Sequence, residues 1–555
     1  MGKVRRLWGF FAFMFAFSYF GSLANVFAFG PLMQGATSSL FNALPQALSV
    51  PGLPFEARTF TVKALDGAEL PGHVLVPRNV SKGQKLPVIL FVHSWLFNQI
   101  EYVTQEAQFA SKGYIVGSYD CRGWYAGQGK IQVTGPAEMD DLSRVLDHIL
   151  SSTPADSSNV GVTGVSYGGG HALLAPAFDE RVKAVYSMSG WADLQDALVP
   201  YDSGKGLWDL ALVGSAQMIA SPDPMLWRWI SSFLTGGPSE REATKQDLGR
   251  RSPKAYVDRI NAKGTPVYIQ NNINDDLFTS RQMVDFFGSL NVPKKLAFLN
   301  GVHATGEMPG MLFMSSFAWD QAHKWFDYWL KGVPTGIMDE PDVHVYTKWN
   351  DSLAAFDNLP LNDSAMNLVV TNDGLREGGD ASSKTYRLEH RVGISDTNSG
   401  IFMMTPLMYS YFGLPVTQGP KIAGNSIDWD TIVFSTPVTF MGIPEVKLNV
   451  RTDSTTFQVN AFLWDVDPSG RASMLLHEAY TKFEATPGSV YPVDIRMNLL
   501  AQKLGAGHKL RLTLSTSDPA FALSVLQPFT LEVLSGQDGP TSLTLPVVSG
   551  QRSAQ

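Results

Sequence analysis

A serine between glycines is the first residue of this chain whose surroundings suggest chemistry. The run Gly164-Val165-Ser166-Tyr167-Gly168 follows an apolar stretch at 160–163 and leads into residues that can begin a helix. On such a strand-to-helix turn the backbone is strained, and side chains at the two glycine positions would collide with neighbouring backbone. The pattern predicts that Ser166 projects its hydroxyl group over the edge of a sheet as a nucleophile. The alternative is a glycine-rich turn with an incidental serine.

A serine hydroxyl group is a poor nucleophile unless a histidine takes up its proton, so the ten histidines are the next residues to consider. His303 follows a predicted buried strand and sits in a short loop, and we predict it as the general base. His323 lies inside a predicted helix, where packing or exposure to solvent is expected. His93 follows an earlier strand and either shapes the loop that binds the oxyanion or has a structural role.

The carboxylate that orients the imidazole should lie between the serine and the histidine along the chain, because this type of fold has the order serine, acid, histidine. The turn Asn274-Asp275-Asp276-Leu277-Phe278 follows the strand before that of His303. Two adjacent carboxylates compete there, and only one can face the ring. We favour Asp275 as the acid, with Asp276 as the alternative. The other carboxylate is expected to cap a helix or to stand in solvent.

Two N–H groups should stabilise the negative charge that develops on the carbonyl oxygen of the substrate. The backbone N–H of Tyr167, the residue after the nucleophile, is one predicted donor. The second should come from the loop after the strand at 86–92, from the backbone of Ser94 or Trp95. Together these residues predict hydrolysis of an acyl bond through a covalent acyl-Ser166 intermediate.

The elements that position these residues follow an alternating pattern. Short apolar strands are separated by helix-like stretches such as 138–150, where apolar residues recur at helical spacing. Buried strands that alternate with helices indicate a parallel sheet covered on both faces. A hairpin is predicted before this sheet, around Asp66-Gly67. The predicted strands are 86–92, 114–119, 160–163, 182–188, 266–270 and 296–299.

A long insertion at 191–264 interrupts this alternation. It is rich in tryptophan and mostly helix-like, and it follows a strand whose C-terminal end faces the binding crevice of such sheets. We predict a helical cap that acts as a lid, and its aromatic residues also predict a small core of its own. Acidic residues in the insertion could bind a substrate ammonium group or simply face solvent: Asp193, Asp196, Asp202 and Asp209.

The second half of the chain has a different residue pattern. After a predicted closing helix at 325–331, helical spacing fades, and short strands separated by Gly, Pro, Asn and Asp follow. This spacing predicts a β-sandwich. The strands expected are 367–370, 431–434, 446–450, 458–464, 510–514 and 530–534. The expected organisation is therefore a catalytic domain at 57–335 and a β-sandwich domain at 340–550.

Composition argues against several classes of protein. Lys and Arg number 43 against 51 Asp and Glu, and this acidic balance disfavours nucleic-acid binding. The single cysteine, Cys121, excludes an intrachain disulfide and a four-cysteine zinc site. The run at 465–470 resembles the start of a calcium loop, but its twelfth position is Leu476 rather than Glu, which favours a hairpin turn. The sequence carries no nucleotide, nicotinamide or zinc motif, so we predict no cofactor and no metal.

The N-terminus predicts export. Lys3, Arg5 and Arg6 precede an apolar run at 7–20, and small residues at the spacing of a cleavage site follow, which indicates a signal peptide at 1–28. The alternative is an uncleaved membrane anchor, because the apolar character continues to about residue 30. We expect a periplasmic or extracellular protein that has no membrane contact after cleavage.

Several longer motifs resemble one family. They are the turn around Ser166, Asp120-Cys121-Arg122-Gly123, the runs at 274–278 and 325–332, Gly442-Ile443-Pro444, and the runs at 463–470 and 507–512. Over 57–550 the chain resembles the X-Pro dipeptidyl-peptidase and cocaine-esterase type of α/β-hydrolase. It differs at Asn272, where that family often has glycine. It also differs near Trp95, where some members place a tyrosine hydroxyl as an oxyanion donor; the indole N–H is a donor of different geometry.

The resemblance implies an α/β-hydrolase domain with a helical cap that forms part of the acyl pocket, followed by an all-β jelly-roll domain. The implied activity is that of a serine hydrolase that cleaves ester or amide bonds, with esterase activity favoured. The alternative is an Xaa-Pro dipeptidyl-peptidase, which needs an anionic group for the substrate ammonium. A non-catalytic protein that binds carbohydrate or another surface is less favoured. The expected partners are a small acyl ester, an amide or a short peptide, and a homo-oligomer is compatible with the sequence.

Overall fold

The computed structural model describes residues 52–347, 353–392, 395–396, 415–521, 525–536 and 539–548. The predicted signal peptide at 1–28 lies outside these residues. Within the described ranges, no helix is both long enough and apolar enough to cross a membrane.

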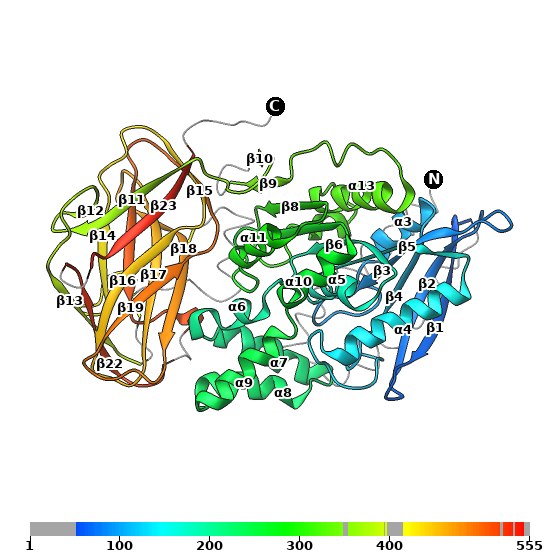
Figure 1. The fold of residues 1–555 in the computed structure, drawn as a ribbon, viewed down its shortest axis with the longest axis horizontal. Helices are drawn as coiled ribbons and strands as arrows, with labels where there is room; N and C mark the ends of the chain where they lie inside the picture. The colour runs from blue at the N-terminus through cyan, green and yellow to red at the C-terminus, as the bar shows by residue number, and fades with distance from the viewer. Residues whose placement is uncertain are drawn as a thin grey trace.

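The first half of the chain folds around one ten-stranded sheet (Figure 1). Its strands lie in the order β1-β2-β4-β3-β5-β6-β7-β8-β9-β10. Neighbours from β4 to β9 are parallel, whereas β1, β2 and β10 pair in the antiparallel sense. The strands are β1 (Phe55–Lys63), β2 (Glu69–Pro77), β3 (Leu86–Val92), β4 (Ile115–Tyr119), β5 (Ala155–Val165), β6 (Val182–Met188), β7 (Val267–Asn272), β8 (Lys294–Leu299), β9 (Val343–Tyr346) and β10 (Leu353–Phe356).

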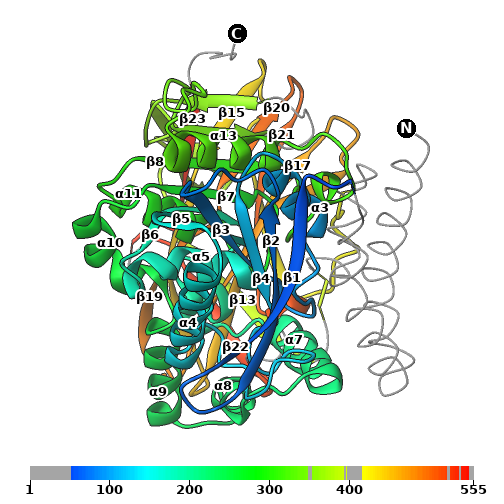
Figure 2. The same cartoon turned by 90° about the vertical axis from the view of Figure 1, so that its right-hand side faces the viewer.

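Helices cover both faces of this sheet, which explains why its central strands are apolar throughout. Val88 of β3 lies in the core cluster shared with α4 (Pro136–Ser152), whereas its neighbour Ile89 lies in the cluster shared with α3 (Val103–Ser111). Successive side chains of a strand point to opposite faces, so a strand buried on both sides needs apolar residues at every position. Figure 2 shows α3 and α4 on opposite sides of the strands. The other helices are α5 (Tyr167–Phe178), α11 (Ser280–Ser289), α12 (Met308–Met311) and α13 (Phe317–Lys331).

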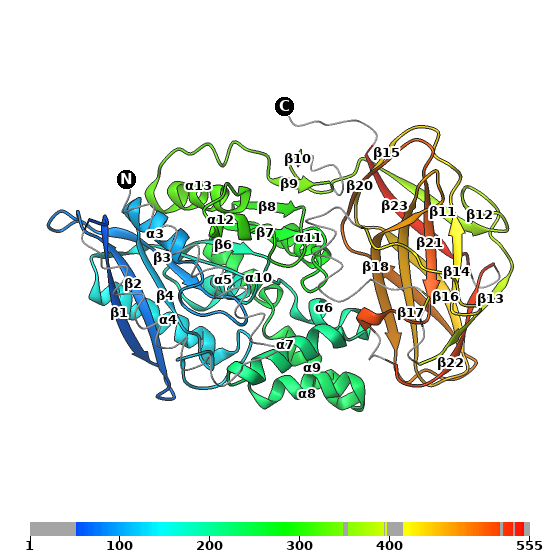
Figure 3. The same cartoon turned by 180° about the vertical axis from the view of Figure 1, so that it is seen from behind.

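The insertion between β6 and β7 forms a helical cap. Asp193 and Asp223 begin two of its helices by accepting backbone N–H groups of the first turn, and Pro224 stands at the first helical position, where its missing N–H costs nothing. Figure 3 shows α6 extending from this cap toward the C-terminal domain. The cap consists of α6 (Leu194–Leu198), η1 (Pro200–Asp202), α7 (Gly206–Ile219), α8 (Pro224–Leu234), α9 (Pro238–Gly249), η2 (Pro253–Tyr256) and α10 (Val257–Lys263).

The second half folds into two antiparallel sheets around a separate apolar core. The predicted fold class, an α/β-hydrolase with a helical cap followed by an all-β jelly-roll sandwich, is confirmed. One sheet has the order β14-β21-β17-β18, which places β18 at an edge. The elements are β11 (Ser364–Thr371), β12 (Gly374–Glu377), β13 (Thr385–His390), β14 (Ser426–Asp430), β15 (Val438–Gly442), β16 (Glu445–Thr452), β17 (Phe457–Val466), β18 (Ala472–Lys482), β19 (Val490–Arg496), β20 (Leu500–Leu504), β21 (Lys509–Ser515), η3 (Pro519–Phe521), β22 (Phe529–Leu534) and β23 (Ser542–Val548).

Two details differ from the sequence-based expectations. The predicted strand at 431–434 is wrong, because β14 ends at Asp430 and a loop follows it. Ile432 and Val433 are 64% and 55% exposed there, so this apolar run belongs to no buried strand. The sheet of the first half also continues through β9 and β10 to Phe356, past the expected domain end at residue 335.

Candidate active site

Ser166 stands at the sharp turn between β5 and α5. Its φ of 57° is positive, which is a costly conformation for a residue with a side chain. A Cβ atom at Gly164 would come within 2.3 Å of the Val92 carbonyl oxygen, and one at Gly168 within 1.9 Å of the same atom. Only glycine fits at these two positions, so the spacing of the motif follows from the close approach of α5 to β3.

The structure brings Ser166, His303 and Asp275 together in one hydrogen-bonded series. Ser166 Oγ lies 2.8 Å from His303 Nε2, and His303 Nδ1 lies 2.8 Å from Asp275 Oδ2. An ionised carboxylate can only accept a hydrogen bond, so Nδ1 carries the ring proton and Nε2 is free to take the serine proton. The geometry is that of a nucleophile, a general base and an orienting acid.

Backbone groups fix the Asp275 carboxylate. Its side chain has no exposed surface, and its second oxygen, Oδ1, accepts the N–H groups of Leu277 and Phe278, both at 2.9 Å. These bonds leave Oδ2 aimed at the imidazole. An orienting acid must stay fixed toward the imidazole, and these backbone bonds hold Asp275 in that position.

Asp276, the alternative acid, does not face His303. Its Oδ1 lies 3.5 Å from Nε2 of His477, which belongs to β18 of the C-terminal domain. The expectation that the second carboxylate caps a helix or stands in solvent is therefore wrong, although its side chain is 34% exposed. Nothing in the sequence could place a residue of the second domain beside this turn.

The predicted oxyanion donors come from two elements. Tyr167 is the first residue of α5, and N–H groups at a helix N-terminus favour negative charge. The Trp95 indole is excluded as a donor to the oxyanion, because its Nε1 donates to the Leu212 carbonyl oxygen in α7 at 3.0 Å. The Ser94 N–H is also engaged, by Glu101 Oε2 at 2.6 Å. Within the described part of the chain the Trp95 backbone N–H donates to no protein acceptor. Tyr167 and Trp95 remain predictions in this role.

A buried carboxyl group supports the oxyanion loop, which we define as residues 93–97. Glu101 accepts both the N–H and the hydroxyl group of Ser94, and burial raises the pKa of Glu101 to about 8. The Tyr102 hydroxyl group accepts the Val165 N–H at 2.9 Å, which ties this support to the residue before the nucleophile. The sequence carries no motif that signals either residue.

His93, the first residue of this loop, holds the same residue, Ser94, through its carbonyl oxygen. Its Nδ1 lies 2.8 Å from the Ser94 carbonyl oxygen, and its Nε2 accepts the Cys121 N–H at 3.0 Å. Burial lowers the pKa of His93 to about 4, so the ring is neutral and donates through Nδ1. Of the two roles considered for His93, shaping the oxyanion loop fits these contacts.

A second buried network lies beneath the catalytic loops. Glu307 Oε1 accepts the Ser189 hydroxyl group at 2.6 Å, and Oε2 accepts Asn272 Nδ2 at 3.0 Å. Asn272 Oδ1 in turn accepts the Gly306 N–H, within the loop that carries His303. The asparagine that departs from the family pattern thus ties the ends of β6 and β7 to the histidine loop. Burial raises the pKa of Glu307.

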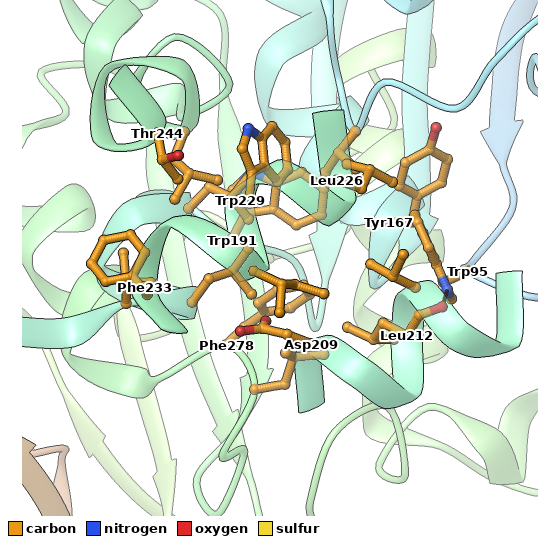
Figure 4. Close-up of a pocket in the computed structure, with 18 of the residues that line it drawn as sticks. Trp95, Tyr167, Trp191, Asp209, Leu212, Leu226, Trp229, Phe233, Thr244 and Phe278 are labelled. Atoms are coloured by element: carbon orange, nitrogen blue, oxygen red, sulfur yellow. Dashed lines mark hydrogen bonds between the residues drawn. The ribbon is translucent and has the colours of Figure 1, made fainter. Parts of the chain in front are cut away.

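An apolar pocket opens beside Ser166 (Figure 4), and the empty space in it and in its opening to solvent amounts to about 770 Å³. Its walls come from the cap, from the oxyanion loop and from the turn that carries Asp275. The Phe278 ring lies edge-on to the His303 ring at 5.0 Å, and Trp208 of α7 does so at 6.2 Å. The larger lining residues are Trp95, Trp191, Leu212, Leu226, Trp229, Phe233 and Phe278.

Asp209 contributes a carboxyl group to this apolar wall. Burial raises the pKa of Asp209 to about 7, and Lys205 opposes part of that rise. The other three acidic residues considered for a substrate ammonium are engaged elsewhere: Asp193 with Lys254, Asp196 with Arg281, and Asp202 with Lys245. Of those four, only Asp209 lines the pocket. No group of three metal-ligating side chains occurs among the residues that the structure describes.

Two family models match this chain. Residues 66–305 match X-Pro dipeptidyl-peptidase (S15 family), and residues 426–547 match the X-Pro dipeptidyl-peptidase C-terminal non-catalytic domain. A "Putative Xaa-Pro dipeptidyl-peptidase" of Bacillus cereus is 28% identical over 199 residues, which are 34% of this chain and 32% of that protein. The chain spans less than half the length of the curated relatives that it matches.

Solved structures share the fold over most of the chain. An α-amino acid ester hydrolase has a TM-score of 0.69 at 15% identity, covering 90% of this chain and 97% of that one. A CocE/NonD family hydrolase from Staphylococcus aureus has a TM-score of 0.66 at 14% identity, covering 89% and 94%. The fold and the family matches define a serine hydrolase. Residues 66–305 and 426–547 are thus similar to the catalytic and C-terminal domains of the X-Pro dipeptidyl-peptidase family, and the solved CocE/NonD family structure shares this fold.

Proposed function

We propose that this chain hydrolyses carboxylic esters of small apolar acids through a covalent acyl-Ser166 intermediate. One observation carries the proposal: the hydrogen-bonded series of Ser166, His303 and Asp275 ends at the wall of an almost wholly apolar pocket. The series supplies an activated nucleophile, and the pocket can hold an acyl chain away from water. Both requirements of acyl transfer therefore meet at one hydroxyl group.

The proposed reaction has two halves. His303 Nε2 accepts the Ser166 proton as Oγ bonds to the ester carbonyl carbon, and the oxyanion accepts hydrogen bonds from the backbone N–H groups of Tyr167 and Trp95. His303 then gives its proton to the alcohol oxygen as the carbon–oxygen bond breaks. A water molecule repeats these steps on the acyl-enzyme, which releases the acid and restores Ser166. Asp275 stays ionised and orients the imidazole throughout.

The apolar lining predicts a preference for longer acyl chains. Each methylene group that leaves water contributes about 0.8 kcal/mol, which is about a fourfold gain in kcat/KM if it is expressed in the transition state. We expect kcat/KM to rise from p-nitrophenyl acetate to butyrate and hexanoate until the pocket is filled. Equal values across this series would contradict an acyl group in the pocket.

Asp209 supports a second candidate, an Xaa-Pro dipeptidyl-peptidase. A carboxylate in the wall of the pocket that Ser166 lines can pair with the free ammonium group of a peptide N-terminus, and the matching family model is described by that activity. However, Asp209 is the only carboxyl group among the described lining residues, and its pKa of about 7 leaves it partly neutral at neutral pH. We therefore favour the ester substrate.

The first experiment compares kcat/KM for p-nitrophenyl butyrate and Ala-Pro-p-nitroanilide, with Ser166→Ala as the blank. We expect a strong preference for the butyrate, and a loss of several orders of magnitude in the blank with an unchanged thermal unfolding curve. Retained activity in Ser166→Ala would overturn the proposed nucleophile.

Asp209→Asn separates the two candidates. It keeps the size of the side chain and removes its charge, so we expect it to leave hydrolysis of the butyrate nearly unchanged. If the wild type prefers the dipeptide anilide and Asp209→Asn raises KM for that substrate alone, the chain is a peptidase with an ammonium site at Asp209.

A further inference from the structure

The C-terminal domain reaches the acid turn, which we define as residues 274–278. Figures 1 and 3 show β18 on the side of this domain that faces the hydrolase domain. His477 of β18 is buried, with its Nε2 3.5 Å from Asp276 Oδ1 and its Nδ1 2.7 Å from Asp518 Oδ2. Asp518 is itself fully buried. The imidazole therefore joins one carboxylate of its own domain to the residue that follows Asp275.

The charge of His477 strengthens this link. Burial by itself would lower its pKa, but the Asp518 and Asp276 carboxylates outweigh that effect and raise the pKa of His477 to about 10. The ring is thus protonated at neutral pH: its Nδ1 donates to Asp518 at 2.7 Å, and its Nε2 forms an ion pair with Asp276 at 3.5 Å. Hydrogen bonds between charged groups are shorter and stronger than neutral ones, particularly where water is excluded.

Other contacts hold the acid turn and the helix after it. Lys205 Nζ, from the cap, donates to the carbonyl oxygens of Asp276 and Leu277 at 2.5 and 3.1 Å. Ser280 Oγ, at the start of α11, accepts the Leu499 N–H of the C-terminal domain at 2.9 Å. The turn is therefore clamped between the cap and the jelly roll.

One further ion pair crosses the same boundary. Arg281 Nη1 donates to Glu478 Oε2 at 2.9 Å, while its Nη2 donates to Asp196 Oδ1 of the cap at 2.7 Å. The side chains of Arg281 and Glu478 are almost completely buried. Two successive residues of β18, His477 and Glu478, thus bind the segment that begins with the catalytic acid.

We propose that His477 is a positioning residue for the hydrolytic reaction: through Asp276 it holds the turn that aims Asp275 at His303. This inference rests on the proposed function, and in particular on Asp275 as the orienting acid. Asp275 can serve only while its Oδ2 stays within hydrogen-bond reach of His303 Nδ1, and a displacement of about 1 Å near a reacting group can cost about a hundredfold in rate. A domain whose described residues contribute no group to the pocket would then control kcat.

The primary test is His477→Gln, assayed with p-nitrophenyl butyrate. We expect kcat to fall by about ten- to a hundredfold while KM changes little, because the acyl pocket is untouched. His508→Gln is the matched control, since His508 Nδ1 also bonds a carboxylate, Asp465 Oδ1 at 2.6 Å, but entirely within the jelly roll. Equal kcat in the wild type and His477→Gln would overturn the inference, and so would equal losses in both histidine variants.

A merely structural role is distinguished by the Asp275→Asn background. If His477 acts through Asp275, adding His477→Gln to Asp275→Asn should lower kcat no further. An undiminished additional loss would overturn the inference. Because loss of a buried histidine can impair folding, Asp276→Asn serves as the second variant, since its side chain is one-third exposed; it should also lower kcat without changing KM.

The same set of variants separates the two proposals. If Asp275→Asn retains full activity, the proposed role of Asp275 fails and the inference fails with it. If Asp275→Asn loses activity while His477→Gln and Asp276→Asn do not, the proposed function stands and only the inference is overturned.

Discussion

The two loops beside the catalytic serine are held in place by different kinds of interaction. The acid turn is held largely by charged side chains from distant parts of the chain, with His477 from the second domain and Lys205 from the cap. The oxyanion loop is held from within its own domain by Glu101 and by the neutral ring of His93, both buried. The ion pair of His477 is lost only as pH rises toward the His477 pKa of about 10, whereas the Glu101 carboxyl group, with a pKa of about 8, is mostly neutral at pH 7 and acts through buried hydrogen bonds. The two supports can therefore be weakened separately.

The largest expected effect tests the acid turn itself. Asp275→Asn should lower kcat by about 10⁴, because an amide in place of the carboxylate favours the wrong tautomer of His303. Asp276→Asn should lower it by about ten- to a hundredfold, since Asp276 acts only through the position of its neighbour. Steady-state kinetics of the two variants side by side provide the measurement. The reverse ranking would move the acid by one residue and remove the basis of the comparison.

The next effect tests the oxyanion loop. In Glu101→Ala both oxygens that accept from Ser94 are removed, which leaves the buried Ser94 N–H without its acceptor, while the Ser94 hydroxyl group keeps the Val165 carbonyl oxygen at 3.0 Å. We expect a loss of about 1–3 kcal/mol of stability and a drop in kcat of up to about a hundredfold, if the Trp95 N–H is displaced. Thermal unfolding and kinetics measured on the same sample check both effects. Wild-type kcat with a lowered Tm would mean that Glu101 supports the fold but not the reaction.

The smallest effect concerns the pH dependence of stability. The pKa of His477 is about 10 in the folded protein, above its usual value of about 6.5 in an unfolded chain. Its contribution to the free energy of unfolding is therefore fully present below pH 6.5 and is lost as pH rises through 10. The difference in Tm between wild type and His477→Gln should shrink over that range. A constant difference would mean that the ring is held by packing rather than by charge.

Several parts of the site could be predicted because local rules determine them. The strained turn at Ser166 requires its glycines, and the chain order of such folds places the acid and base after it, which predicted His303 as the base and limited the acid to Asp275 or Asp276. The central strands could be recognised because burial on both faces demands unbroken apolar sequence. The predicted strand at 431–434 was wrong because an apolar run is not always buried: Ile432 and Val433 lie in a loop that no sheet covers.

The residues that sequence reasoning missed act across long separations in the chain. Glu307 joins Ser189 to Asn272, and His477 reaches Asp276, and no spacing or motif relates these pairs. Asn272 gave the only signal, as a departure from the family pattern, but that signal did not indicate a partner. The orientation of the Trp95 indole could not be predicted for the same reason, because its hydrogen-bond acceptor is a backbone carbonyl group in the cap, far away in the sequence.

The placement of Asp518 after the hydrolase domain in the sequence has a consequence for biosynthesis. A chain that leaves the ribosome N-terminus first completes the hydrolase sheet, with Ser166 and His303, well before His477 and Asp518 emerge. If the jelly roll aims the acid turn, the nascent hydrolase domain would hold Ser166 and His303 but would lack a correctly placed acid, and its activity would be low. Full esterase activity would then appear only when the jelly-roll domain had folded, so a chain truncated before Asp518 would remain a weak catalyst even with an intact sheet.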